Sequence, residues 1–276
     1  MDLPPLTFAG IRFVIAAAIL FGVMMIFNVS LPRSRKDWVL LAVTGVLSFS
    51  LNYGLIFWGE QFISSGLAAV LQATIPAFGL IIAHFYLPTE QLSLLKIIGV
   101  VMGIIGVAVI FSNELTVAGP RALAGGVALI FSSAFVAYSN VLVKAHARNI
   151  NPGFIAFGQM LFGLIPLLLI GIPLEGNPLS FRWTTMAIVS LFYLAIVGSV
   201  VAFLLYYWLV QNMDVTNTML IALVTPVVAV LLGMLVLNER LTWRTLLGGL
   251  MIMLGIGLIV IRPRQEKEVT AAQIRS

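Results

Sequence analysis

Residues 65–87 read SGLAAVLQATIPAFGLIIAHFYL, a run of 23 residues without aspartate, glutamate, lysine or arginine. An α-helix needs about 20 consecutive apolar residues to cross the hydrocarbon core of a bilayer. The run is apolar on all sides rather than alternating, so a half-buried strand does not explain it. It predicts a transmembrane helix with one proline, Pro76, near its middle.

Eight more stretches have the same character, separated by short breaks that carry turn or charged residues. Hydrophobic residues make up 61% of the 276 residues and charged residues only 9%, too few for a soluble domain of this size. The sequence therefore predicts an all-α polytopic membrane protein with nine transmembrane helices. The predicted spans are residues 8–28, 38–59, 65–87, 94–112, 121–143, 153–173, 184–209, 215–237 and 242–261.

Lysine and arginine lie mainly in the breaks between spans, where they indicate orientation. With Arg12 left out because it lies within a span, ten of them fall on one side and four on the other. The richer side is predicted to be cytoplasmic, which places the C-terminus inside and the N-terminus outside. The basic residues form no stripe, so the net charge of +5 does not indicate a nucleic-acid partner.

The second half of the chain repeats features of the first. Pro76 and Pro226 both lie mid-span, 150 positions apart, and each precedes an acidic turn, with Glu90 or Glu239. Leucine-rich helices align by chance, but a shared order of proline, glutamate and glycine favours duplication. Further matches pair Gly99 with Gly248 and Gly106 with Gly255 at an offset of 149, and Pro5 with Pro152 and Arg12 with Gln159 at an offset of 147.

The spacing of the two copies predicts their relative orientation. Five spans lie between Pro5 and Pro152, and because five is odd the second copy enters the membrane from the opposite side. Inverted-topology repeats are a recurring transporter architecture, with a site near the bilayer midplane between the halves. We therefore expect residues 5–112 to superpose on residues 152–261 in the opposite orientation.

The two copies resemble the EamA-like family of the drug/metabolite transporter superfamily. The resemblance rests on the runs Pro76–Gly106 and Pro226–Gly255 and on PLTFAGIRF at residues 5–13. It implies ten helices in two inverted halves that export or exchange small metabolites without ATP.

The resemblance also implies a domain division. Residues 1–113 would form the first EamA-like repeat, residues 119–262 the second, and residues 263–276 a soluble tail. Only four residues precede Pro5, so the first helix of the first half is expected to be missing. The helix at 121–143 would then lack its mate.

Polar side chains inside the spans are the candidates for a substrate cavity, because an unpaired polar group in lipid costs several kcal/mol. Asn52 follows Ser48 by four residues, so the two share a helix face. The prolines are expected to bend cavity-lining helices. Hydrogen bonding between or within helices is the alternative role for each polar residue. The predicted cavity residues are Ser48, Asn52, Gln72, Pro76, Ser133, Tyr206, Thr225 and Pro226.

Charged residues within or beside the spans are expected to have structural roles and not to bind substrate or transfer protons. Arg12 could bind an anionic substrate, but we expect it to reach lipid phosphates or to pair with Glu60. Glu90 and Glu239 flank helix starts, where a carboxylate favours the positive end of the helix dipole, so we expect capping rather than proton coupling. The chain has no cysteine and two histidines, and its acids lie in loops, so no metal site, cofactor or catalytic set is expected.

The leading interpretation is a secondary-active transporter in the bacterial inner (plasma) membrane. It would export or exchange a small polar or amphipathic metabolite by alternating access. An inert truncated transporter or a membrane scaffold is the alternative, and an intramembrane enzyme is less favoured. The expected partners are a small-molecule substrate and membrane lipid, and no nucleic acid.

Overall fold

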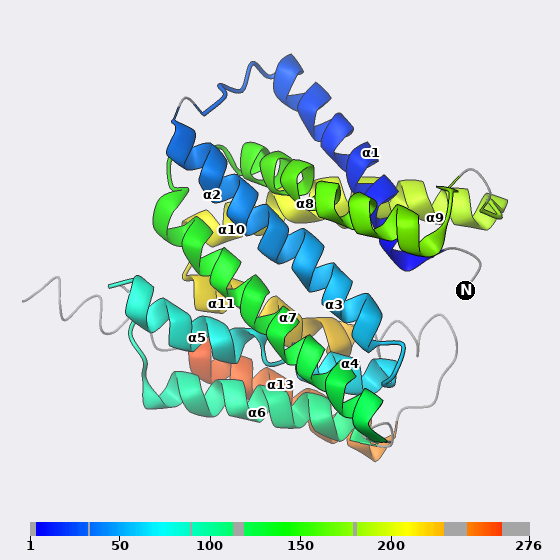
Figure 1. Cartoon of the computed structure of the whole chain (residues 1–276). Coiled ribbons are helices and arrows are strands. Elements are labelled where there is room, and N and C mark those ends of the chain that lie inside the picture. The colour runs from blue at the N-terminus through cyan, green and yellow to red at the C-terminus, as the bar shows by residue number, and fades with distance from the viewer. Residues whose placement is uncertain are drawn as a thin grey trace, which may run out of the picture.

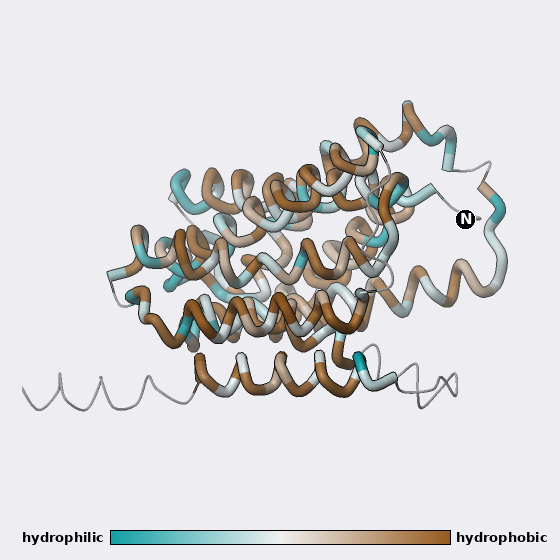
Figure 2. The backbone as a smooth tube through the Cα atoms, turned by 90° about the horizontal axis from the view of Figure 1, so that it is seen from below, coloured by the Kyte–Doolittle hydropathy of each residue, from teal (hydrophilic) through white to brown (hydrophobic). Residues whose placement is uncertain are grey.

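The protein is a bundle of tilted helices in this computed structural model, which describes residues 4–32, 34–88, 90–112, 119–178, 181–228 and 242–260 (Figure 1). Those residues form helices and turns and contain no strand. Seven helical segments are long and apolar enough to span a membrane, and two apolar helices are shorter. Each of the nine coincides with a predicted span, so the polytopic all-α fold is confirmed. Hydrophobic residues run along the helices and hydrophilic residues gather at their ends (Figure 2).

The elements follow the chain in two sets. The first set is α1 (Pro5–Ile26), α2 (Arg35–Gly45), η1 (Val46–Leu51), α3 (Asn52–Gly59), α4 (Ser65–Gln72), α5 (Ile75–Tyr86) and α6 (Leu94–Ile110). The second set is α7 (Gly119–His146), α8 (Pro152–Glu175), α9 (Thr185–Ala195), η4 (Ile196–Val201), α10 (Ala202–Asn212), α11 (Val215–Met219) and α13 (Trp243–Val260).

Local sequence explains where most helices begin. Lipid offers no partner for the first N–H groups of a helix, so a side chain must accept their hydrogen bonds. Hydroxyl groups do this at the starts of α2, α4, α6 and α9, where the capping residues are Ser34, Ser64, Ser93 and Thr184. At the start of α8 the Asn151 side chain accepts from the Gly153 N–H at 2.8 Å. The first residues of α1 and α8 are Pro5 and Pro152, which lack the N–H that would need a partner.

Two spans contain the same irregularity. The span Arg35–Gly59 passes through the π-helical segment η1, and the span Thr185–Asn212 passes through η4. The segments start at Val46 and Ile196, 150 positions apart, which is the offset between Pro76 and Pro226. A π turn shifts hydrogen bonding away from the regular α-helical pattern and is frequent at functional sites.

Pro76 interrupts its span, whereas the sequence suggested that it bends a continuous helix. α4 ends at Gln72 and α5 begins at Ile75, so Pro76 lies in the first turn of α5. A first-turn N–H would have no intrahelical partner, so proline fits there without loss of a bond. In the second half α11 is also short, but Pro226 lies inside the helical stretch that follows it.

α6 and α13 pack against each other through glycines, at the bottom of Figure 1. A methyl group added at Gly99 would lie 2.5 Å from the Gly255 carbonyl oxygen, and one added at Gly106 would lie 2.7 Å from that of Gly248. The two helices are therefore antiparallel and their backbones touch. Since Gly99 matches Gly248 and Gly106 matches Gly255 in the repeat, this contact is reciprocal between the halves.

α1 and α8 form a second antiparallel pair with the same reciprocity. A methyl group added at Gly10 would meet the Leu168 side chain at 2.4 Å. At the repeat offset of 147, Gly10 corresponds to Phe157 and Leu168 corresponds to Phe21. The Phe21 and Phe157 rings also contact each other, with centroids 5.7 Å apart. The matching helices of the two halves thus pack on one another.

α7 packs on the first half of the chain, beside α3 and α5 (Figure 1). Gly125 of α7 and Gly59 of α3 are in backbone contact, because a methyl group on either would lie within 2.9 Å of the other's carbonyl oxygen. The corresponding span of the second half, made of α9, η4 and α10, is less buried than the span of α2, η1 and α3. The span Thr185–Asn212 is 22% buried, against 39% for Arg35–Gly59.

We predict that Gly255→Ala lowers stability and that Gly249→Ala in the same helix does not. A methyl group at Gly255 would press on the α6 backbone at 2.5 Å, whereas one at Gly249 has no atom within 4 Å. Overpacking costs about 1–3 kcal/mol, while alanine for glycine in an open helix position gains roughly 0.5–1 kcal/mol. Thermal unfolding in detergent measures both; equal melting temperatures for the two variants would contradict this packing.

Candidate substrate pathway

A buried chain of polar side chains joins α7 to the span of α2, η1 and α3. The Ser132 hydroxyl donates to Asn52 Oδ1 at 2.6 Å, and Asn52 Nδ2 donates to the Ser48 carbonyl oxygen at 3.1 Å. The Ser48 hydroxyl donates to Ser139 Oγ at 2.7 Å, and Ser139 donates to the Thr44 carbonyl oxygen at 3.1 Å. Two of the predicted cavity residues, Ser48 and Asn52, therefore bond to neighbouring polar groups.

The same chain continues to α8 and α10. Gln159 Nε2 donates to Thr44 Oγ1 at 2.9 Å, and Gln159 Oε1 accepts a hydrogen bond from the Tyr207 hydroxyl. Gln159 is fully buried, so neither lipid nor water can bond to its amide. These two side chains supply the partners that a buried amide needs. We call these linked residues, from Ser132 to Tyr207, the polar network.

Tyr206 is held beside the polar network by a separate bond. Asn140 Nδ2 of α7 donates to the Tyr206 hydroxyl at 2.7 Å. Among the described side chains, the buried polar atoms without a partner are only Thr7 Oγ1 and Asn217 Oδ1. The polar groups of the spans are therefore almost completely satisfied, which locks four neighbouring spans together.

The interruption between α4 and α5 brings Ser133 and Gln72 to one region. The Leu71 carbonyl oxygen, freed by the end of α4, accepts from Thr74 Oγ1 at 2.5 Å and from Ser133 Oγ at 3.3 Å. Pro76 is buried beside this turn, while Gln72 is half-buried and makes no side-chain hydrogen bond within the described residues. Gln72 is thus a predicted site residue whose amide has no partner among the described residues.

The structure does not bring Thr225 to the polar network. Thr225 is exposed and donates to the Ile221 carbonyl oxygen of its own helix at 2.8 Å. Pro226, one residue further on, is buried. Thr225 and Pro226 therefore lie on an exposed and a buried part of the same helix, and the sequence did not show which of the two would be buried.

A cavity of about 530 Å³, which we call the Arg12 cavity, lies where α1 begins and α3 ends. Its wall is mainly apolar and aromatic, with one arginine and one glutamate. Sequence reasoning named Arg12 and Glu60 but missed the aromatic wall, because no spacing rule places Phe8 near the end of α3. The lining residues are Pro5, Phe8, Ala9, Arg12, Tyr53, Phe57, Glu60, Gln61 and Leu194.

Arg12 bonds to the π-helical segment η4 of the other half. Its Nε donates to Ser199 Oγ at 2.7 Å and its Nη2 donates to the Gly198 carbonyl oxygen at 3.0 Å. We expected Arg12 to reach lipid or to pair with Glu60. The structure instead directs Arg12 inward, and no Arg12–Glu60 ion pair forms among the described residues.

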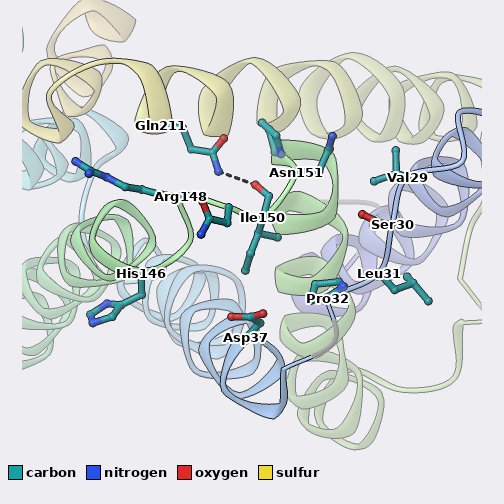
Figure 3. Close-up of a pocket in the computed structure, with 12 residues that line it drawn as sticks. Val29, Ser30, Leu31, Pro32, Asp37, His146, Arg148, Ile150, Asn151 and Gln211 are labelled. Carbon is teal, nitrogen blue, oxygen red and sulfur yellow. Dashed lines mark hydrogen bonds between the residues drawn. The ribbon is translucent and has the colours of Figure 1, made fainter.

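A second cavity of about 740 Å³ lies at the opposite end of α1, between the α1–α2 loop and the turn from α7 to α8 (Figure 3). We call it the Arg148 cavity. Its lining is polar, and Gln211 closes one side by donating to the carbonyl oxygens of Ala147 and Ile150 at 2.8 and 2.7 Å. The lining residues are Val29, Ser30, Leu31, Pro32, Asp37, His146, Arg148, Asn149, Ile150, Asn151, Pro152 and Gln211.

Glu90 caps a helix of the other half and not the next helix of its own, which Ser93 caps. Its carboxylate accepts from the backbone N–H groups of Val215 and Thr216 at 2.6 and 3.2 Å, at the start of α11. The predicted capping role therefore holds for Glu90, but with a different helix; Glu239 lies outside the described residues. Glu175 acts similarly on the N–H groups of Leu6 and Thr7.

These features define a polytopic helical membrane protein with a polar core and a cavity at each end of its first described helix. The chain belongs to the EamA-like transporter family, whose sequence profile matches residues 1–112 and 123–261. The family resemblance inferred from the repeat is thereby confirmed, and the protein is a membrane transporter.

Named relatives cover most of the chain. It is 29% identical to the uncharacterized transporter YoaV of Bacillus subtilis, over 92% of this chain and 87% of that protein. It is 28% identical to the uncharacterized inner membrane transporter YedA of Escherichia coli, over 83% and 73%. It is also 29% identical to a probable amino-acid metabolite efflux pump of Escherichia coli, over 97% and 89%. These relatives confirm the prediction of a multi-pass inner membrane protein.

A solved crystal structure has the same fold. It matches with a TM-score of 0.83 over 95% of this chain and 89% of the other, at 17% sequence identity. At that identity the likeness concerns the fold alone, and it agrees with the helical architecture described above.

We predict unequal stability effects for two amides that looked alike in the sequence. Asn52→Ala removes the acceptor of the buried Ser132 hydroxyl and should cost about 1–3 kcal/mol. Gln72→Ala breaks no hydrogen bond among the described residues and should change stability by less than about 0.5 kcal/mol. Melting temperatures in detergent measure both effects; a Gln72→Ala variant as unstable as Asn52→Ala would place Gln72 in a structural network.

Proposed function

We propose that the protein is a secondary-active transporter that exports or exchanges a small polar or amphipathic metabolite by alternating access. The observation that carries the proposal is the pair of cavities at opposite ends of α1. α1 has 22 residues, so about 33 Å separates its ends, close to the thickness of the hydrocarbon core. The polar network lies in the spans that connect these two ends, and in this proposal it separates the cavities.

The two halves act in this proposal as inverted repeats. Two contacts and one spacing support that relation: the glycine contact of α6 with α13, the packing of α1 on α8, and the matched positions of η1 and η4. In each case, residues related by the repeat offset occupy corresponding places. Inverted repeats provide two related conformations, one open to each side, with the site between the halves.

The charge distribution supports an orientation for this transporter. The Arg148 cavity lies on the side that carries ten of the fourteen loop lysines and arginines, so it faces the cytoplasm in this proposal. At the same end, Glu90 of the first half is bonded to the start of α11 in the second half. This bond holds the halves together at the cytoplasmic end, whereas the Arg12 cavity opens to the other side.

The nature of the cargo follows from the wall chemistry and from one relative. The Arg12 cavity combines aromatic side chains with two charged groups, which fits an amphipathic metabolite. The name of one relative, a probable amino-acid metabolite efflux pump, is consistent with a small cargo of that kind. The sequence contains no nucleotide-binding GxxxxGK[ST] motif, so the driving force proposed is an ion or solute gradient.

Cysteine labelling tests alternating access directly, because the chain contains no native cysteine. We expect Phe57→Cys in the Arg12 cavity and Ile150→Cys in the Arg148 cavity to change reactivity in opposite directions when a transported solute is added. Gln91→Cys, exposed in the α5–α6 loop on the same side as Ile150 but outside the lining of both cavities, is the matched control and should label constantly. An impermeant maleimide on proteoliposomes gives the readout, after an uptake screen across amino acids, sugars, nucleosides and organic acids identifies the solute.

The same experiment separates a transporter from a scaffold. A scaffold would show no uptake above empty liposomes for any solute class, and its two cavity positions would label independently of solute. Uptake with parallel changes at both positions would contradict alternating access while leaving transport in place.

A further inference from the structure

Two buried charged side chains hold the turn between α10 and α11, which we call the α10–α11 turn (residues 211–216). Glu90 lies in the loop between α5 and α6 and is 1% exposed. Lys144 lies in the last turn of α7 and is 9% exposed. Burying a charge costs free energy unless the charge is bonded, so the bonds of these two residues show what keeps them there.

Lys144 bonds to the end of α10. Its Nζ donates to the carbonyl oxygens of Gln211 and Met213 at 3.0 and 2.6 Å, and Met213 is the residue that ends the helix. The carboxyl end of a helix carries partial negative charge, so an ammonium group is favourable at this position. The bond also connects α7 to α10.

Glu90 bonds to the start of α11. Its carboxylate accepts from the Val215 and Thr216 N–H groups at 2.6 and 3.2 Å, and from the Thr216 hydroxyl at 2.9 Å. Asp214 occupies the N-cap position of α11, yet its side chain makes no capping bond within the described residues. The cap therefore comes from a residue 125 positions away and not from the adjacent acid.

Other helix starts show that capping alone needs no charge. Neutral hydroxyl groups next to the helix cap α2, α4, α6 and α9. Such local caps stabilise one helix and connect it to nothing else. The cap on α11 instead connects that helix to the α5–α6 loop, so it controls how two parts of the bundle lie relative to each other.

Both charges hold the α10–α11 turn from the same side of the bundle. Glu90 follows α5, and α7 packs on α2, α3, α4 and α5. The turn also borders the Arg148 cavity, because Gln211 lines that cavity and donates to the Ala147 and Ile150 carbonyl oxygens (Figure 3). Movement of the turn away from α7 would therefore widen the Arg148 cavity.

A charged group favours two arrangements of such a turn over any intermediate. In the dry, closed arrangement the carboxylate and the ammonium are satisfied by backbone groups. If the turn moves away and water enters, water satisfies them instead. A position between the two leaves a charge both dry and unbonded, which costs far more than it does for a neutral hydroxyl. Two discrete arrangements are what a conformational switch requires.

We propose that Glu90 and Lys144 form a cytoplasmic latch on the α10–α11 turn. They hold the turn against α7 while the Arg12 cavity is open, and they release it when the Arg148 cavity opens. Both are positioning residues, because they contact the turn and not the cargo. This inference rests on the proposed alternating access, since it names the contacts that separate the two conformations.

Cysteine labelling of the full-length protein in nanodiscs tests the latch without any solute, because both faces are accessible there. Ile150→Cys reports on the Arg148 cavity and Phe57→Cys on the Arg12 cavity. Glu90→Gln should raise the labelling rate of the Ile150→Cys reporter by about fivefold and lower that of Phe57→Cys, because it weakens charge-assisted bonds of the closed state alone. Lys144→Met should shift both rates in the same directions.

Glu175→Gln is the matched control for charge and capping. Glu175 accepts from the Leu6 and Thr7 N–H groups at 2.9 and 2.7 Å, the same chemistry at the start of α1. It joins α1 to α8, which already pack on each other, so its loss should lower the melting temperature and leave the ratio of the two labelling rates unchanged.

Thr216 offers a milder variant in case Glu90→Gln does not fold. Thr216→Val removes one of the three bonds to Glu90 and keeps the size of the side chain. It should shift the labelling ratio in the same direction as Glu90→Gln but by a smaller factor. Thr216→Ser keeps the hydroxyl group and should leave the ratio unchanged.

Lower melting temperatures with an unchanged labelling ratio in the Glu90 and Lys144 variants would overturn the latch and leave two helix caps. A shift in Glu175→Gln as large as that in Glu90→Gln would overturn it too, because loss of stability would then explain the effect. The uptake screen tests transport separately. Transport of a solute with no shift in labelling refutes the latch alone, and a shift with no transported solute refutes the transport function and leaves the two-state turn.

Discussion

Lipid offers no hydrogen bonds, and this single constraint organises the whole structure. Every polar group within a span needs a partner inside the protein, at a penalty of several kcal/mol if it finds none. Serine, threonine and asparagine side chains cap helix starts, Glu90 and Glu175 accept N–H groups across the fold, and the polar network joins four spans. Hydrophobic burial contributes little between helices in lipid, so these bonds and close backbone packing hold the bundle together.

Glycine supplies the close packing. At Gly99, Gly106, Gly248 and Gly255 the backbones of α6 and α13 approach so closely that any side chain would collide with a carbonyl oxygen. Dispersion then acts over the whole helix length, and weak Cα–H to carbonyl contacts become possible. The same device joins α3 to α7 at Gly59 and Gly125. At these positions glycine therefore marks where two helices touch, whereas Gly249 has no atom within 4 Å of the place a side chain would take.

Much of the architecture could be predicted from the sequence, because hydropathy and glycine or proline spacing are local properties. Within the described residues an apolar helix coincides with each of the nine predicted spans, and the offsets of 147 to 149 reappear as contacts between α6 and α13 and between α1 and α8. The partners of polar side chains could not be predicted. Asn52 and Gln72 look equivalent in the sequence, yet Asn52 finds Ser132 on α7 and Gln72 finds no described partner. Thr225 faces outward and Glu90 caps α11, because both outcomes depend on tertiary packing.

The difference between the two halves is more informative about function than their likeness. If the two halves share one architecture, residues at matching positions have similar structural roles. A difference in residue type between matching positions therefore suggests a role beyond holding the helices together. Gln159 is a neutral, fully buried amide that bonds α8 to Thr44 of the opposite half. Arg12 bonds to η4 through two of its five N–H donors. Unlike Gln159 it is charged, and it lines a cavity that has aromatic walls. The Arg12 guanidinium also lies 5.1 Å from the centre of the Phe13 ring, so a cation–π contact stabilises part of its charge. Arg12 therefore differs from Gln159 in two ways: it is charged, and it contacts a cavity as well as the opposite half.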